Sequence, residues 1–165
     1  MVVHPHEGAS RPAHDGLRVV VYVPHGAPVA IYDGCSGTYT IGDTHGPLTL
    51  QFDGGGTVTA GHVDETHIVV RGATNVRLTA VVGDVLDIAA DGVPDIGVLG
   101  GRVDRLRAKL VGSGWIGYAG TARAADLTLH GPGNVHVNNV AESLQQLRIG
   151  SGRIRIDHPP PARSA

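Results

Sequence analysis

Glycine-rich corners recur along the chain at a nearly constant spacing, and this repeat constrains the fold more than any other feature. They begin at Gly34, Gly54, Gly72, Gly92, Gly112, Gly131 and Gly150. From Gly54 onward the steps are 18, 20, 20, 19 and 19 residues. A fixed repeat of this length is typical of a solenoid, in which each unit stacks on its neighbours. Glycine suits the corners because it adopts a positive φ at little steric cost.

Two short apolar segments accompany every corner. After the corner come pairs separated by one residue: Tyr39 and Ile41, Val58 and Ala60, Val76 and Leu78, Ile96 and Val98, Ile116 and Tyr118, Val135 and Val137, Ile154 and Ile156. Before it come the alternating segments Leu48–Phe52, Ile68–Val70, Leu86–Ala90, Leu106–Leu110, Leu127–Leu129 and Leu147–Ile149. Alternate residues of a strand face the same side. We therefore expect all these apolar side chains to face inward.

One such repeat cannot bury its own apolar face, whereas parallel stacking about 4.8 Å apart buries all of them in one column. The repeat predicts an all-β chain folded as a single-stranded parallel β-helix of about 7–8 coils. We place this domain at residues 17–157, with Leu17–Val23 and Val29–Tyr32 as its first strands. Residues 1–16 and 158–165 lack periodicity and are expected to be disordered tails, the second of them rich in proline.

Composition excludes several classes of protein. The net charge of −2 argues against a nucleic-acid partner, which needs a basic surface. One cysteine, Cys35, cannot form an intramolecular disulfide framework. No run of 18 apolar residues encodes a transmembrane helix. Met1–Asp15 contains no apolar segment of a signal peptide, so we expect either a cytoplasmic protein or a leader missing from the sequence.

Ionisable residues give no clear chemical site. The ten histidines show no zinc-site spacing, and we interpret those in the repeats as surface residues. Asp84 and Asp104, twenty residues apart, are expected to stack at one bend. The repeats differ by only two residues in length, so no long loop can wall a cleft. We therefore predict no catalytic residues, no metal, no cofactor and no enzyme activity.

Trp115 is a large aromatic residue at the position directly after a corner, where the neighbouring coils carry Asn75, Asp95, Asn134 and Arg153. By the alternation of the strand Ile116 points inward, so Trp115 points outward. An outward tryptophan can stack on a sugar or anchor a protein contact. The alternative is that it packs over Gly97, Gly117 and the adjacent surface.

Three corners share a form of sequence seen in a known family. They are Gly112-Ser113-Gly114-Trp115-Ile116, Gly131-Pro132-Gly133-Asn134-Val135 and Gly150-Ser151-Gly152-Arg153-Ile154. In these three segments the chain resembles the head GIN domain family of auto-transporter adhesin-like domains. The resemblance extends over about residues 17–157. The family's usual aspartate after the corner is kept only at Asp95. The resemblance implies a right-handed β-helix in the periplasm, at the outer membrane or outside the cell. It supplies no catalytic residues.

The function predicted from these features is a non-enzymatic envelope or cell-surface module that binds an unidentified protein or carbohydrate. An alternative is a cytoplasmic, bactofilin-like filament protein, because a short β-solenoid can stack end to end through its exposed coils. A third class, a β-helix polysaccharide lyase or esterase, lacks the loops and grouped carboxylates that such catalysis needs.

Overall fold

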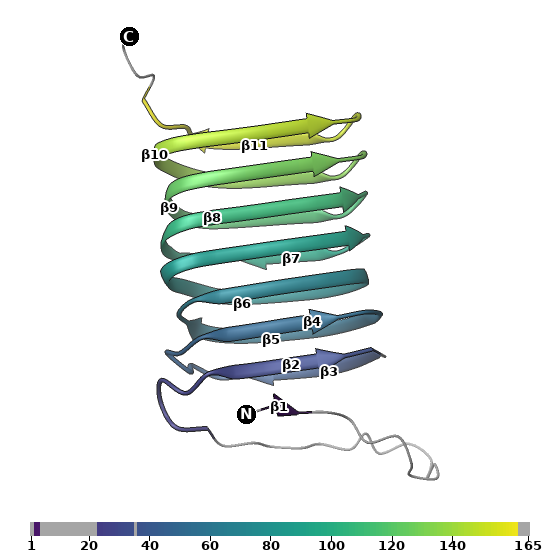
Figure 1. Cartoon of the computed structure of the whole chain (residues 1–165), viewed down its shortest axis with the longest axis vertical. Coiled ribbons are helices and arrows are strands. Elements are labelled where there is room, and N and C mark those ends of the chain that lie inside the picture. Colours follow the sequence, from purple (N-terminus) through teal and green to yellow (C-terminus); the bar gives the residue numbers. More distant parts are fainter. Residues whose placement is uncertain (1, 4–22, 35, 162–165) are drawn as a thin grey trace.

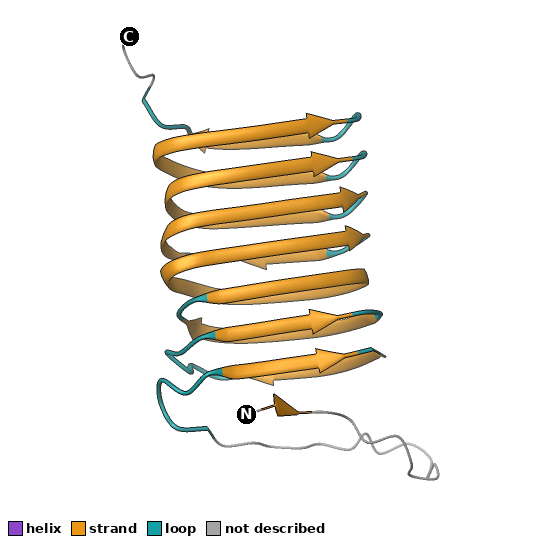
Figure 2. Cartoon of the chain, viewed as in Figure 1, coloured by secondary structure: helices purple, strands orange, loops and turns teal. Residues whose placement is uncertain are grey.

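The computed structural model describes residues 2–3, 23–34 and 36–161. Over these residues the chain contains strands and no helix, and it winds into a β-solenoid of about 7 turns (Figures 1 and 2). The strands are β1 (Val2–Val3), β2 (Val29–Asp33), β3 (Ser36–Ile41), β4 (Leu48–Phe52), β5 (Gly55–Val63), β6 (Thr66–Gly92), β7 (Asp95–Val98), β8 (Gly101–Gly112), β9 (Trp115–His130), β10 (Asn134–Ile149) and β11 (Arg153–His158). The described part contains no helix that could cross a membrane.

Every strand pair is parallel, as the repeat predicts. The first face of the solenoid holds the segments before each corner: β2, β4, two parts of β6, most of β8 and the second halves of β9 and β10. The second face holds the segments after each corner: β3, β5, the middle of β6, β7, the first halves of β9 and β10, and β11. Since the strands are in register, residues one coil apart lie above each other in columns.

The core is a set of aliphatic columns between the two faces. Leu50, Ile68 and Ile88 represent one column of the first face and are at most 1 % exposed. Val76, Ile96 and Ile116 form the equivalent column of the second face and are as deeply buried. The predicted alternation is confirmed for the pairs from Val58 to Val137. In the first coil Tyr39 is only half-buried.

The glycine corners stack directly on one another. Gly131 has a φ of +114°, and a Cβ added to it would lie 2.7 Å from the carbonyl oxygen of Gly112, one coil below. Real Cβ atoms do not approach a backbone oxygen so closely. The corner column therefore depends on glycine for both its backbone conformation and its spacing.

The predicted strand Leu147–Ile149 has the opposite orientation to the one expected, so its apolar side chains do not face the core. In the last coil Gln146 and Arg148 pair with Leu127 and Leu129, while Leu147 and Ile149 point outward and are 52 % and 53 % exposed. The cause is the position of the apolar pair relative to its corner: Leu147 and Ile149 lie three and one residues before Gly150, whereas Leu127 and Leu129 lie four and two residues before Gly131. A displacement by one residue moves a side chain to the other face of a strand. No described coil covers this end, so polar side chains at the inward positions keep their contact with water. Such a polar cap is typical of terminal repeats.

The terminal segments differ in part from the expectation. Val29–Tyr32 is confirmed as β2, whereas the predicted strand at 17–23 lies outside the described residues except for Val23, which belongs to no strand. Within the predicted N-terminal tail, Val2–Val3 form β1 and pair with β2. At the other end β11 extends to His158, one residue beyond the predicted boundary, and Pro159–Pro161 follow it outside any strand.

Candidate functional site: the groove beside Trp115

Trp115 opens β9 on the second face and lies between Asp95 and Asn134 in an outward-facing column. Its side chain is 38 % exposed, as the alternation predicts, while the next residue, Ile116, is 1 % exposed. The described core contains Tyr118 and Phe52 as its large aromatic side chains. Trp115 therefore presents an aromatic surface where the neighbouring coils carry small or polar residues.

Two glycines give the indole room to lie along the sheet. Gly97 and Gly117 are neighbours in the outward column beside Trp115. A Cβ added to Gly117 would lie 2.8 Å from Cζ3 of Trp115, so the six-membered ring lies over the Gly117 backbone. The packing of Trp115 over Gly117, expected as the alternative to a binding role, is thus confirmed. Trp115 remains 38 % exposed in this position.

The missing side chains also create a groove of about 320 Å³ next to the indole. Its lining comes from four successive coils: Gly97, Val98, Leu99, Trp115, Gly117, Tyr118, Ala119, His136, Asn138 and Asp157. Leu99 is 66 % exposed and adds a second apolar side chain. The groove therefore combines a flat floor, an aromatic side and a polar rim.

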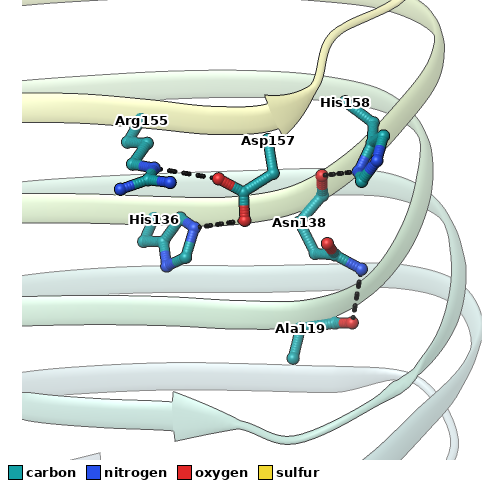
Figure 3. A network of polar contacts seen from close by, with 6 residues as sticks. All are labelled: Ala119, His136, Asn138, Arg155, Asp157 and His158. Atoms are coloured by element: carbon teal, nitrogen blue, oxygen red, sulfur yellow. Dashed lines mark hydrogen bonds and ion pairs between the residues drawn. The ribbon is translucent and has the colours of Figure 1, made fainter.

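A hydrogen-bonded network forms the polar rim (Figure 3). The Nε2 atom of His136 lies 2.8 Å from Oδ2 of Asp157, and Nε of Arg155 donates to Oδ1 of the same carboxylate at 2.9 Å. One coil below, Nδ2 of Asn138 donates to the carbonyl oxygen of Ala119 at 3.1 Å. These contacts hold the side chains in place while leaving several of their polar atoms at the surface.

The network also fixes the charge of the rim. The hydrogen bonds from His136 and Arg155 hold the pKa of Asp157 below its ordinary value, so the carboxylate stays ionised. Arg155 is 70 % exposed and keeps guanidinium donors free for a ligand. The rim thus offers both donors and acceptors.

An ion pair borders the groove on its other side. Arg77 donates to both carboxylate oxygens of Asp95, at 3.1 Å and 2.7 Å. The side chain of Arg77 passes over Gly97, where an added Cβ would lie 3.3 Å from its Cδ. The bond to Asp95 raises the pKa of Arg77, so this residue remains a cation.

The second predicted cluster, Asp84 and Asp104, does lie at one bend, where both line a shallow groove of about 480 Å³. Two basic residues that were not predicted to lie there, Arg105 and Arg123, line the same groove. Nε of Arg123 donates to Glu142 at 2.9 Å. The bend therefore carries mixed charge on a solvated surface.

Three histidines stack at the bend of the first coils, a feature that the sequence spacing did not reveal. The ring centroids of His25 and His45 are 4.8 Å apart, and those of His45 and His62 are 6.0 Å apart. Asp43 accepts hydrogen bonds from the backbone N–H and ring of His62, which lower the pKa of Asp43. Parallel rings do not converge on one point, and no described group of three potential ligands is placed to hold a metal.

The family comparison agrees with this architecture. Residues 36–160 match the family model described as "Putative auto-transporter adhesin, head GIN domain". The chain belongs to this family. The match spans every strand from β3 to β11, including the groove residues of the second face. The searches of curated proteins and of solved structures found no match to the chain.

The family description bears directly on the expected class of protein. The words of the description suggest an adhesin-like head domain in the envelope or outside the cell. The family description thus suggests a non-enzymatic role in that setting. It assigns no ligand, so the ligand has to be inferred from the groove.

Proposed function

We propose that this chain is a non-enzymatic binding module of the cell envelope or cell surface, and that the groove beside Trp115 holds a carbohydrate. The observation that supports this most is the outward indole, which lies beside two glycines and opposite a polar rim. The adhesin description of the family supports the same class of function.

A sugar ring matches the chemistry of this groove. One face of a pyranose is a patch of C–H groups, which stacks on the face of an aromatic ring, and its edge is a row of hydroxyls. Trp115 supplies a large apolar surface at a low entropic cost. Asp157 and the side-chain Oδ1 of Asn138 accept hydrogen bonds from hydroxyls, and Arg155 donates to hydroxyl oxygens. A flat, open groove suits one or two residues of a longer chain.

The groove does not favour hydrolysis of such a chain. Acid–base cleavage needs two groups that converge on the scissile bond. Among the described lining residues Asp157 is the one carboxylate, and its two oxygens already accept from His136 and Arg155. We therefore propose retention of the glycan rather than turnover, in an envelope or extracellular setting.

Replacing Trp115 by alanine is expected to weaken carbohydrate binding about tenfold or more, because aromatic anchors dominate the energy of such contacts. The wild-type and Trp115→Ala proteins are compared on an array of neutral and acidic oligosaccharides, followed by calorimetry on the ligands found. Trp115→Phe keeps an aromatic face and is expected to bind between the two.

Val82→Ala serves as the control, since Val82 is 55 % exposed and lies outside the groove. All the variants are expected to melt near the wild-type temperature. Equal affinity of the wild-type and Trp115→Ala proteins, or no binding across the array by the wild-type protein, would contradict the proposal.

A further inference from the structure

The groove beside Trp115 crosses four coils, and an arginine without an acidic partner, Arg153, lies at the C-terminal end of this surface. We infer that the ligand of the groove is an acidic glycan, whose chain runs along the solenoid axis and whose carboxylate or sulfate group pairs with Arg153. This inference deepens the proposed carbohydrate binding and rests on it.

The direction of the ligand follows from the course of the groove. Its lining residues come from four successive coils, so the groove runs across the strands rather than along them. Consecutive coils are about 4.8 Å apart, which is close to the length of one sugar residue in an extended chain. Successive sugars of a glycan can therefore lie over successive coils.

One outward column places an aromatic ring and a cation along this direction. The column contains Asp95, Trp115, Asn134 and Arg153, one residue from each coil. Trp115 and Arg153 are two coils apart, or about 10 Å by the spacing of neighbouring strands. A sugar that stacks on the indole thus has its neighbour beside Asn134, and the acidic group of the next unit reaches Arg153.

Arg153 differs from the other arginines of the second face because it has no acidic partner among the described residues. Arg77 donates to both carboxylate oxygens of Asp95, and Arg155 donates to Asp157. Arg153 is exposed, and no ion pair joins it to another described side chain. Its guanidinium therefore keeps its donors for a ligand, and their planar arrangement matches a carboxylate or sulfate group.

The carboxylate of Asp157 in the rim does not oppose an acidic ligand. Its two oxygens already accept hydrogen bonds from Arg155 and His136, so its charge is compensated within the protein. Arg153 and Arg155 together carry two positive charges against the one negative charge of Asp157. The C-terminal end of the groove is therefore positive, and an anionic group is favoured there.

The distribution of charge along the solenoid favours the same orientation of the ligand. Residues 144–158 contain three arginines and one acidic residue. Residues 23–70 contain five acidic residues and no lysine or arginine. An acidic chain is thus attracted toward the C-terminal coils and repelled from the N-terminal coils.

The test uses tetrasaccharides that contain uronate or sulfate groups, each compared with its carboxyl-reduced or desulfated counterpart. Calorimetry with the full chain is expected to show about tenfold tighter binding of the acidic form than of its neutral counterpart, with an affinity that falls as salt rises. The uronate and sulfate series show separately which anion is recognised.

Arg153→Gln is expected to remove this preference, with about tenfold weaker binding of the acidic forms and unchanged binding of the neutral ones. Arg153→Lys keeps the charge without the planar donors and is expected to bind acidic forms with intermediate affinity. Lys109→Gln is the control, since it removes an exposed cation from the first face, and it is expected to keep the wild-type preference. Melting curves of all three variants are expected to match the wild type.

The outcomes distinguish this inference from the proposed function. Equal binding of acidic and neutral forms that is lost in Trp115→Ala would keep the carbohydrate site and overturn the acidic ligand. An acidic preference that persists in Arg153→Gln, or that disappears equally in Lys109→Gln, would also overturn the inference. Absence of binding to both forms of every tetrasaccharide would contradict the proposed function itself, and the inference with it.

Discussion

Replacing Gly112 by valine is expected to lower the free energy of unfolding by about 3 kcal/mol or more. Gly112 has a φ of +122°, a conformation that a β-branched residue strongly disfavours. Its added Cβ would also overlap the carbonyl oxygen of Gly92 in the coil below. Urea unfolding followed by circular dichroism at the β-sheet band measures the change.

Gly42→Val is the matched control for this substitution. Gly42 lies at a bend where an added Cβ would meet nothing within 4 Å, and its φ is outside the left-handed region. We expect its free energy of unfolding to stay within about 0.5 kcal/mol of the wild type. Equal stability of the two valine variants would mean that the corners do not stack as described.

Leu127→Ala is expected to cost about 2–5 kcal/mol of stability, whereas Leu147→Ala should cost about 0.5 kcal/mol or less. Leu127 is fully buried, and its removal leaves a cavity in the column. Leu147 is 52 % exposed and points away from the core. The two residues are twenty apart and occupy the same place in the predicted repeat, so the comparison isolates the register of the last coil.

Thermal and urea unfolding of the two leucine variants measure this difference. A large loss of stability in Leu147→Ala would show that Leu147 faces inward, as the repeat alone predicts, and that Gln146 and Arg148 face outward. The same experiment therefore tests the register of the last coil.

The architecture was predictable because it depends on local patterns. Period-two alternation and glycines at a fixed spacing specify strands and corners without knowledge of any long-range contact. The last coil was mispredicted because its apolar pair, Leu147 and Ile149, lies one residue closer to the glycine corner than Leu127 and Leu129 do, which places it on the other face of the strand. A repeat that averages over coils does not reveal such a shift.

The groove was only partly predictable. The outward position of Trp115 follows from the strand alternation. The polar rim does not, because His136 and Asp157 are 21 residues apart and meet only through the register of β10 with β11. The stacking of the three histidines was not predictable either, because His25, His45 and His62 are separated by unequal numbers of residues.

The fold explains why the groove beside Trp115 can arise without any insertion. All strands run in register, so replacing two outward side chains by Gly97 and Gly117 removes material from adjacent positions of the surface. The neighbouring column then provides Trp115, and the following coils provide the polar side chains. A uniform solenoid can thus form a surface groove through substitution alone.

Fluorescence of Trp115 tests the proposed binding role most directly, because this residue is the one tryptophan of the chain. The full-length protein is titrated with an oligosaccharide found on the array, while emission and quenching by acrylamide are recorded. Stacking of a sugar on the indole predicts a saturable shift of the emission to shorter wavelength and protection from the quencher. Saturable binding by calorimetry with unchanged emission and quenching would contradict the account, since the ligand would then bind elsewhere on the solenoid.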